Sequence, residues 1–360
     1  MFKEAADAPR VVREQLARNR ALVAQAAETL RTLAPRAVVT CARGSSDHAA
    51  TFAKYLIETR AGVLTSSAAP SVSSVYAVAA DLDGVVFLAI SQSGESPDLL
   101  ATAEAAKAAG AHVLALVNSE SSPLAKIAHL TIPLSAGTET SVAATKSYIA
   151  SLAAIVHLVG HWTNDSLMLE ALDLAPSQLA QAWALDWSAA AKMLQSAAHL
   201  YVVARGLGLG VAQEAALKLK ETCGLHAEAF SSAEVRHGPM ALVGKGFPVM
   251  LFGQSDETRE GIETLAAELA QRGATTMLAV GGGGGGGDWK ASAANEDSVA
   301  GVVRAPHSQL PTTLPALRSH PAVEPMLLIQ SFYRMANSLS IARGHDPDRP
   351  PYLNKITETV

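Results

Sequence analysis

Hydrophobic residues along this chain form short continuous runs separated by longer Ala- and Leu-rich stretches. The first four runs cover residues 37–42, 84–90, 112–117 and 130–134. Each run is too short and too continuously apolar for a half-exposed strand, so we predict buried parallel strands with helices on both faces of the sheet. The stretch 96–110 predicts one such helix, which ends at a glycine, and residues 12–33 predict an amphipathic, Arg-rich opening helix.

The same alternation then starts again, with a second set of hydrophobic runs at 199–206, 247–253, 274–280 and 300–305. An Ala-Arg-Gly sequence follows the first strand of each set. The repetition predicts an α/β fold with two tandem doubly wound, flavodoxin-like domains. The predicted segments are a helical lead-in (1–34), a first domain (35–165), a second domain (185–335) and a C-terminal tail (342–360). The proline-rich tail is predicted to be either disordered or an arm packed on the protein.

Composition narrows the class of protein. The chain has 360 residues, 49% of them hydrophobic, and a net charge of −5, which does not favour nucleic-acid binding. Its two cysteines, Cys41 and Cys223, are no disulfide framework and suit a reducing cytosol. The charged N-terminus lacks the apolar core of a signal peptide, and no apolar run reaches the roughly 18–20 residues of a membrane span, so we expect a cytoplasmic protein. The histidines form no HExxH or Cys/His motif, so we predict neither a metal nor a cofactor.

A serine-rich loop, Ser-Gln-Ser-Gly-Glu-Ser at 91–96, directly follows the strand predicted at 84–90. Free backbone N–H groups, hydroxyls and a helix dipole there can bind one oxyanion, although an ordinary serine-rich helix cap is the alternative. The loop lacks the lysine of a nucleoside triphosphate site, so a sugar phosphate fits better. The loop 41–50 is its equivalent after the first strand, where we interpret Asp47 as a capping residue and His48 as structural.

A third polar loop, residues 137–148, opens another helix. Thr138, Thr140 and Ser141 are candidates for helix caps there. Lys146 is interpreted as a surface residue.

Glu214, Lys218 and Glu221 occupy one face of a predicted helix because they are spaced i, i+4 and i+7. A solvated stripe of ion pairs is the alternative interpretation. The helix begins at the ligand edge of the second sheet, where a carboxylate paired with lysine stays ionised and can act as a base. His237 lies on a Gly-Pro turn, and histidine as a residue type suits proton transfer near neutral pH. With the serine loop, these groups predict proton abstraction next to a carbonyl.

Four stretches carry a resemblance to a known family: SQSGES (91–96), SVAATKSY (141–148), EAALKLKETCGLHAEAFSSAEVRHGPMAL (214–242) and PPYLNKITETV (350–360). The chain resembles the sugar isomerase (SIS) domain pair of glucosamine-6-phosphate synthase and its stand-alone deaminase relatives. The resemblance implies two SIS domains, a homodimer with shared active sites, and a tail that covers the site as an ordered lid.

The resemblance also implies residue roles. The phosphosugar is held by Ser91, Gln92, Ser93 and Ser96 at its phosphate, by Gly44, Ser45 and Ser46 beside the sugar, and by the backbone of Val142. Glu221 is the implied base for proton transfer between C1 and C2, supported by Lys218 and Glu214. His237 assists ring opening in the neighbouring subunit, and Lys355 reaches the substrate carbonyl. No chemistry is assigned to His226, Glu228, Glu234 or Arg236, for which we expect structural roles.

The expected reaction converts glucosamine 6-phosphate to fructose 6-phosphate and ammonia. The alternatives are the isomerase part of an aminotransferase-like enzyme, a fructosamine-6-phosphate deglycase, a galactosamine-6-phosphate deaminase and a non-catalytic phosphosugar sensor. The chain departs from the synthase because only a short helix precedes the first strand, so we expect that it cannot draw ammonia from glutamine by itself. The glycine run 281–287 is also foreign to the family pattern, and we predict a surface loop there.

Overall fold

The computed structural model describes residues 1–360 except 77, 79, 282–309, 354 and 356–360, so the predicted strand 300–305 and all but the first residue of the glycine run lie outside the described part. The chain divides into two compact units. Unit 1 comprises residues 1–5 and 177–351, and unit 2 comprises residues 6–176 and 352–360. The division falls inside helix α8 (Ser166–Ala184), directly after Pro176.

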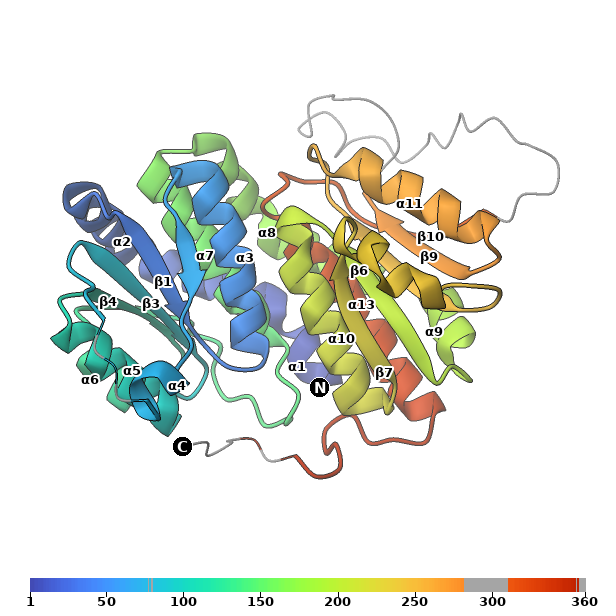
Figure 1. The fold of residues 1–360 in the computed structure, drawn as a ribbon, viewed down its shortest axis with the longest axis horizontal. Helices are drawn as coiled ribbons and strands as arrows, with labels where there is room; N and C mark the ends of the chain where they lie inside the picture. Colours follow the sequence, from blue (N-terminus) through green and yellow to red (C-terminus); the bar gives the residue numbers. More distant parts are fainter. Residues whose placement is uncertain (77, 79, 282–309, 354, 356–360) are drawn as a thin grey trace. The chain divides into compact units, whose positions relative to one another are not determined.

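Unit 2 contains a five-stranded parallel sheet with the strand order β2-β1-β3-β4-β5 (Figure 1). Its strands are β1 (Ala37–Cys41), β2 (Thr65–Ser67), β3 (Val85–Ser91), β4 (His112–Val117) and β5 (Leu130–Pro133). Its helices are α2 (Ala8–Leu33), α3 (Ser45–Ala61), α4 (Ser71–Ser74), α5 (Pro97–Ala108), α6 (Pro123–Ile127) and α7 (Lys146–Thr163). All four hydrophobic runs predicted in this part are strands; β2 has only three small polar residues and gives no hydrophobic signal.

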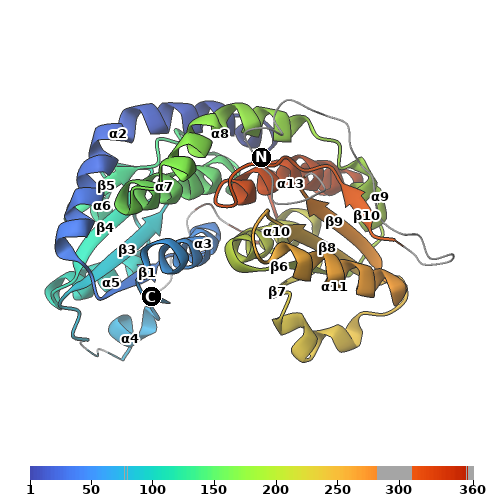
Figure 2. The same ribbon diagram turned by 90° about the horizontal axis from the view of Figure 1, so that it is seen from above.

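Helices cover both faces of this sheet. Figure 2 shows α2 and α7 on one face and α5 on the other, where Phe87 and Val113 of the sheet pack against Leu99 of α5. Two buried polar side chains tie α2 to the rest of the unit. Gln15 donates to the Ala150 carbonyl at 2.9 Å and Asn19 donates to the Pro133 carbonyl at 2.6 Å.

Unit 1 repeats this plan with the strand order β10-β9-β8-β6-β7, again all parallel. Its strands are β6 (His199–Ala204), β7 (His226–Ser231), β8 (Pro248–Gly253), β9 (Thr275–Val280) and β10 (Thr312–Leu314). Its helices are α9 (Ser188–Leu194), η1 (Gly206–Gly208), α10 (Leu209–Cys223), η2 (Glu234–His237), η3 (Pro239–Leu242), α11 (Arg259–Gln271) and α13 (Glu324–Ala342). A short helix, α1 (Phe2–Ala6), opens the chain. The two parallel sheets covered by helices confirm the predicted α/β fold.

Strand β7 and helix α13 are among the elements of unit 1 that the sequence patterns did not predict. In strand β7 the side chains of His226 and Glu228 are exposed, on either side of the buried Ala227. The strand therefore lacks the continuous apolar run that identified most of the other strands. Helix α13 is almost completely buried and packs on α10 (Figure 1). Its buried residues include polar ones such as Gln330 and Asn337, so the burial of this helix does not follow from its pattern of hydrophobic and polar positions.

The packing of α7 makes the stability of unit 2 depend on pH. His157 is buried in α7, and desolvation, followed by the charges of His161 and Arg20, lowers the pKa of its imidazole to about 4. The unfolded chain therefore takes up this proton as the pH falls below about 6.5, while the folded chain stays neutral until about pH 4. At about pH 5 we expect this residue to remove about 2 kcal/mol of stability relative to neutral pH.

Urea unfolding of the wild type and of His157→Gln at both pH values measures this contribution. The variant, which carries no titratable group at position 157, is expected to lose less stability on acidification than the wild type. Equal losses in the two proteins would show that other groups carry the acid sensitivity.

Candidate active site

The two serine-containing loops of unit 2 meet at the carboxyl edge of its sheet, because they follow the adjacent strands β1 and β3. An ion pair joins them. Arg43, in the first loop, donates to Asp98 in the first turn of α5 through Nε at 2.8 Å and Nη2 at 2.6 Å. The structure therefore brings the 42–46 and 91–96 loops together, as expected for parallel strands whose carboxyl ends share an edge.

The loop 91–96 is held in a tight turn by its own hydroxyls. The backbone N–H of Gly94 donates to Ser91 Oγ at 2.9 Å, and that of Glu95 donates to Ser93 Oγ at 3.3 Å. Gly94 has a φ of +68°, and a Cβ there would lie 2.4 Å from Ser122 Oγ. Only glycine therefore fits this position without displacing its neighbours.

The remaining residues of this loop lead directly into the start of α5. Ser96 is the N-cap of α5, yet its hydroxyl makes no capping bond, so it can donate to a ligand. Gln92, Ser93 and Ser96 are all half-buried. Hydroxyls beside a 12-residue helix N-terminus form the kind of site that favours an anion such as phosphate.

The loop after β1 has a similar construction. Gly44 is the N-cap of α3 with a φ of +55°, and Ser45 and Ser46 form the first turn of that helix. Asp47 lies in the same turn rather than at the cap, and burial raises the pKa of its carboxyl. The structure thus places all three predicted residues of this loop at a helix start.

The third loop, residues 137–145, is organised by a residue that sequence analysis did not single out. Glu139 accepts hydrogen bonds from the backbone N–H groups of Thr145 at 2.9 Å and Ser147 at 3.4 Å, at the start of α7. The interpretation of Lys146 as a surface residue is wrong. Its side chain is only 7% exposed and its ammonium lies 3.5 Å from a carboxylate oxygen of Asp7. Val142 lies half-buried in this loop.

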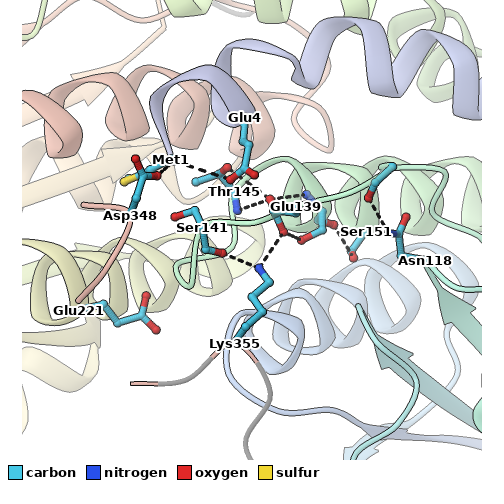
Figure 3. Close-up of polar contacts among 12 residues, drawn as sticks. Met1, Glu4, Asn118, Glu139, Ser141, Thr145, Ser151, Glu221, Asp348 and Lys355 are labelled. Atoms are coloured by element: carbon cyan, nitrogen blue, oxygen red, sulfur yellow. Dashed lines mark hydrogen bonds and ion pairs between the residues drawn. The ribbon is translucent and has the colours of Figure 1, made fainter. Parts of the chain in front are cut away.

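The tail lysine lies on this same loop. Lys355 Nζ donates to the Ser141 carbonyl at 2.6 Å and lies 3.7 Å from Glu139 Oε2 (Figure 3). Two residues predicted to serve the same substrate, Val142 and Lys355, therefore belong to one local cluster although they are far apart in sequence.

Unit 1 contains the predicted acid–base group on α10. Lys218 Nζ lies 2.5 Å from Glu221 Oε2 and 3.5 Å from Glu214 Oε1. Tyr333 of α13 donates its phenolic hydrogen to Glu214 Oε1 at 3.0 Å. The side chains of Glu214 and Lys218 are 0% and 1% exposed, so the alternative of a solvated ion-pair stripe is wrong for these two. Glu221 is 18% exposed and remains accessible for proton transfer.

His237 lies apart from that cluster. It ends η2, is exposed, and lines an open cavity of about 500 Å³ together with Arg205, Arg236, Glu257 and Glu260. None of the three α10 residues lines this cavity. Arg236 forms an ion pair with Glu268 at 2.8 Å.

Comparison with known proteins places these loops and clusters in a family. The sequence profile of the SIS domain matches residues 34–159 and 193–283, which is more than half of the chain. The chain belongs to the SIS domain family. The two matched regions correspond to the two parallel sheets, so each unit carries one SIS domain.

Several proteins are similar to this SIS chain over most or all of its length. It is 32% identical over 329 residues to glutamine–fructose-6-phosphate aminotransferase (isomerizing) of Aeropyrum pernix, which covers 88% of this chain and 50% of that protein. The chain therefore spans about half the length of the curated relatives it matches.

Two solved structures are also similar to this chain over nearly its whole length. A proposed phosphosugar isomerase from Silicibacter pomeroyi DSS-3 is 38% identical, with a TM-score of 0.85 and coverage of 97% of this chain and 99% of that one. The C-terminal domain of glucosamine-fructose-6-phosphate aminotransferase from Francisella tularensis is 25% identical, with a TM-score of 0.80 and coverage of 97% and 98%.

Sequence analysis of this SIS protein missed Arg43, Asp98, Glu139 and Tyr333, which hold the predicted residues in place. A signal existed for Asp98, an acidic residue in a helix first turn, where the dipole favours it. Tyr333 gave none, because its partner Glu214 lies 119 positions away.

Among the described residues, every helix is too short or too polar to span a membrane. Within the same residues, no group of three or more His, Cys, Asp or Glu side chains is placed to hold a metal ion.

Proposed function

We propose that this SIS protein is an aminosugar-phosphate deaminase/isomerase that converts glucosamine 6-phosphate to fructose 6-phosphate and ammonia. The observation that carries the proposal is the α10 cluster, in which a buried lysine holds one partly exposed carboxylate, Glu221, beside it. A carboxylate in this position can act as a general base and accept a proton from a bound substrate. The similarity to isomerising aminotransferases and to a proposed phosphosugar isomerase supports the substrate class.

The proposed reaction assigns one step to each cluster. The phosphate is bound by the 91–96 loop and the sugar by the loop of Gly44–Ser46 and the backbone of Val142. His237 assists opening of the sugar ring, contributed by the second subunit of a homodimer. Glu221 takes the C2 proton and returns it to C1, Lys355 interacts with the sugar oxygen at C1, and water then hydrolyses the C2 imine to the ketone and ammonia. The transferred proton stays within the substrate, so no oxidant or reductant is consumed.

An ammonia-release assay without glutamine tests this proposal against its alternatives. The panel contains glucosamine 6-phosphate, galactosamine 6-phosphate and a fructosamine 6-phosphate. Release from glucosamine 6-phosphate, with fructose 6-phosphate as the second product, is expected. Preference for another member would reassign the substrate, and binding without turnover of any member would indicate a phosphosugar sensor.

A second candidate is the isomerising half of an aminotransferase, favoured because the chain spans about half of the aminotransferases it matches. This activity would appear as glucosamine 6-phosphate formation from fructose 6-phosphate and ammonium. Comparing the rates in both directions separates a synthase half from a deaminase.

The phosphate loop is tested separately by Ser93→Ala. The hydroxyl of Ser93 is half-buried at the start of α5, so its loss removes one donor to the phosphate in both the ground state and the transition state. We expect KM for the phosphosugar to rise about 10-fold with a smaller change in kcat, the pattern of lost uniform binding. An unchanged KM would count against phosphate binding by this loop. Ser122→Ala is not a suitable control because the Ser122 side chain lies against Gly94 of the phosphate loop. Ser73→Ala makes the same chemical change outside the loop and is the better control.

A further inference from the structure

The carboxylate of Glu139 is surrounded by hydrogen-bond donors from one helix start. Its Oε1 accepts from Thr145 N at 2.9 Å, Thr145 Oγ1 at 3.4 Å and Ser147 N at 3.4 Å, while its Oε2 accepts from Ser147 Oγ at 2.5 Å. The side chain is 0% exposed. These donors are all neutral, so they solvate the buried charge without balancing it, and a buried charge is costly unless it is also paired.

The cation beside this carboxylate is the ammonium of Lys355, 3.7 Å from Oε2 (Figure 3). That ammonium also donates to the Ser141 carbonyl at 2.6 Å, and its side chain is 27% exposed. The carbonyl fixes one N–H direction, but a neutral acceptor alone attracts an ammonium weakly. Glu139 supplies the negative charge of the same loop, and its own orientation is fixed by four hydrogen bonds.

We propose that Glu139 is a positioning residue that holds the Lys355 ammonium on the 137–145 loop, beside Val142. The structural part of this inference stands on the contacts of unit 2 alone. Its consequence for catalysis rests on the proposed function, in which Lys355 interacts with the substrate. Glu139 itself, fully buried behind Thr145 and Ser147, acts through Lys355 rather than on the sugar.

The roles of Glu139 in building the loop and in holding the lysine can be separated by substitution. Glu139→Gln keeps an oxygen that can accept from the Thr145 and Ser147 N–H groups, but removes the charge that attracts the ammonium. Ser147→Ala does the reverse, since it removes the hydroxyl bound to Oε2 and leaves the charge. A role in loop structure alone predicts similar effects of the two variants, whereas the positioning role predicts that only Glu139→Gln releases Lys355.

Proteolysis without substrate measures the release directly. A lysine-specific protease cleaves after Lys355, and a side chain held on the loop enters the protease poorly. We expect Glu139→Gln to be cleaved there about fivefold faster than the wild type, the ratio for about 1 kcal/mol of lost ion pairing. Cleavage after the exposed Lys3 is the internal reference, and Ser147→Ala is the matched control. Equal cleavage after Lys355 in Glu139→Gln and the wild type would overturn the proposal.

A double-mutant cycle then tests the consequence for catalysis. Glu139→Gln is expected to lower kcat about 10- to 100-fold with little change in KM, because a misplaced Lys355 affects the reacting carbonyl and not the phosphate. In a Lys355→Met background the same change is expected to have no further effect. A full additional loss in that background would show that Glu139 acts through the loop and not through Lys355. If the wild type turns over no panel sugar, the proposed function fails, while the proteolysis result still decides whether Glu139 holds Lys355.

Discussion

Replacing Glu221 by glutamine is expected to lower kcat for ammonia release about 10²- to 10⁴-fold, the usual contribution of a positioned base. In the wild type, Lys218 Nζ donates to Glu221 Oε2 at 2.5 Å. Glutamine preserves the size of the side chain, and its amide oxygen can still accept this hydrogen bond. It cannot take a proton from C2. Binding of the phosphosugar is therefore expected to persist, and calorimetric titration with glucosamine 6-phosphate together with an ammonia assay measures both quantities.

The matched control for this variant is Glu228→Gln, which changes an exposed carboxylate on the neighbouring strand β7 and is expected to keep wild-type activity. Mixing Glu221→Gln with His237→Ala chains adds a test of the homodimer. If His237 serves the partner's site, each mixed dimer retains one intact site, and roughly a quarter of wild-type activity returns at random pairing. Normal ammonia release by Glu221→Gln would remove Glu221 from the mechanism, and an absence of recovery in the mixture would place His237 in its own subunit.

The parallel strands were predictable because buried strands of a sheet covered on both faces are short, continuous hydrophobic runs. Strand β7 and helix α13 depart from the patterns used to find them, one because its outer residues are polar and the other because it is buried nearly all round. Lys146 was misinterpreted for a different reason. Its ion-pair partner, Asp7, lies 139 positions earlier, so no local pattern could reveal that the lysine is buried.

The helical spacing of Glu214, Lys218 and Glu221 correctly predicted that they share one face of α10, because spacing within a helix is local geometry. Their burial could not be predicted, since it depends on α13, which packs on α10 and provides the Tyr333 hydroxyl. The difference matters for chemistry. A buried lysine between two carboxylates has a fixed position, whereas the same three residues in water would change partners freely.

The Lys218 ammonium is shared by the Glu214 and Glu221 carboxylates, so we expect this lysine to contribute to the stability of unit 1. Glu221 is partly exposed, so solvent can replace the lysine as its partner. Glu214 is completely buried, lies 3.5 Å from the Lys218 ammonium and accepts a hydrogen bond from the Tyr333 hydroxyl at 3.0 Å. We therefore expect Lys218→Met to lower the free energy of unfolding of unit 1 by about 3–5 kcal/mol, the usual cost of removing one partner of a buried ion pair.

Urea unfolding of three variants separates this cost from the loss of a lysine as such. Lys220→Met, at an exposed position of the same helix, is expected to change stability by no more than about 0.5 kcal/mol. The double variant Lys218→Met/Glu214→Gln is expected to recover much of the loss, because it removes the buried carboxylate charge together with the ammonium. If Lys218→Met were as stable as Lys220→Met, the buried pair would not contribute to stability. If the double variant were no better than the single one, the cost would arise from packing around position 218 and not from the loss of the Lys218–Glu214 ion pair.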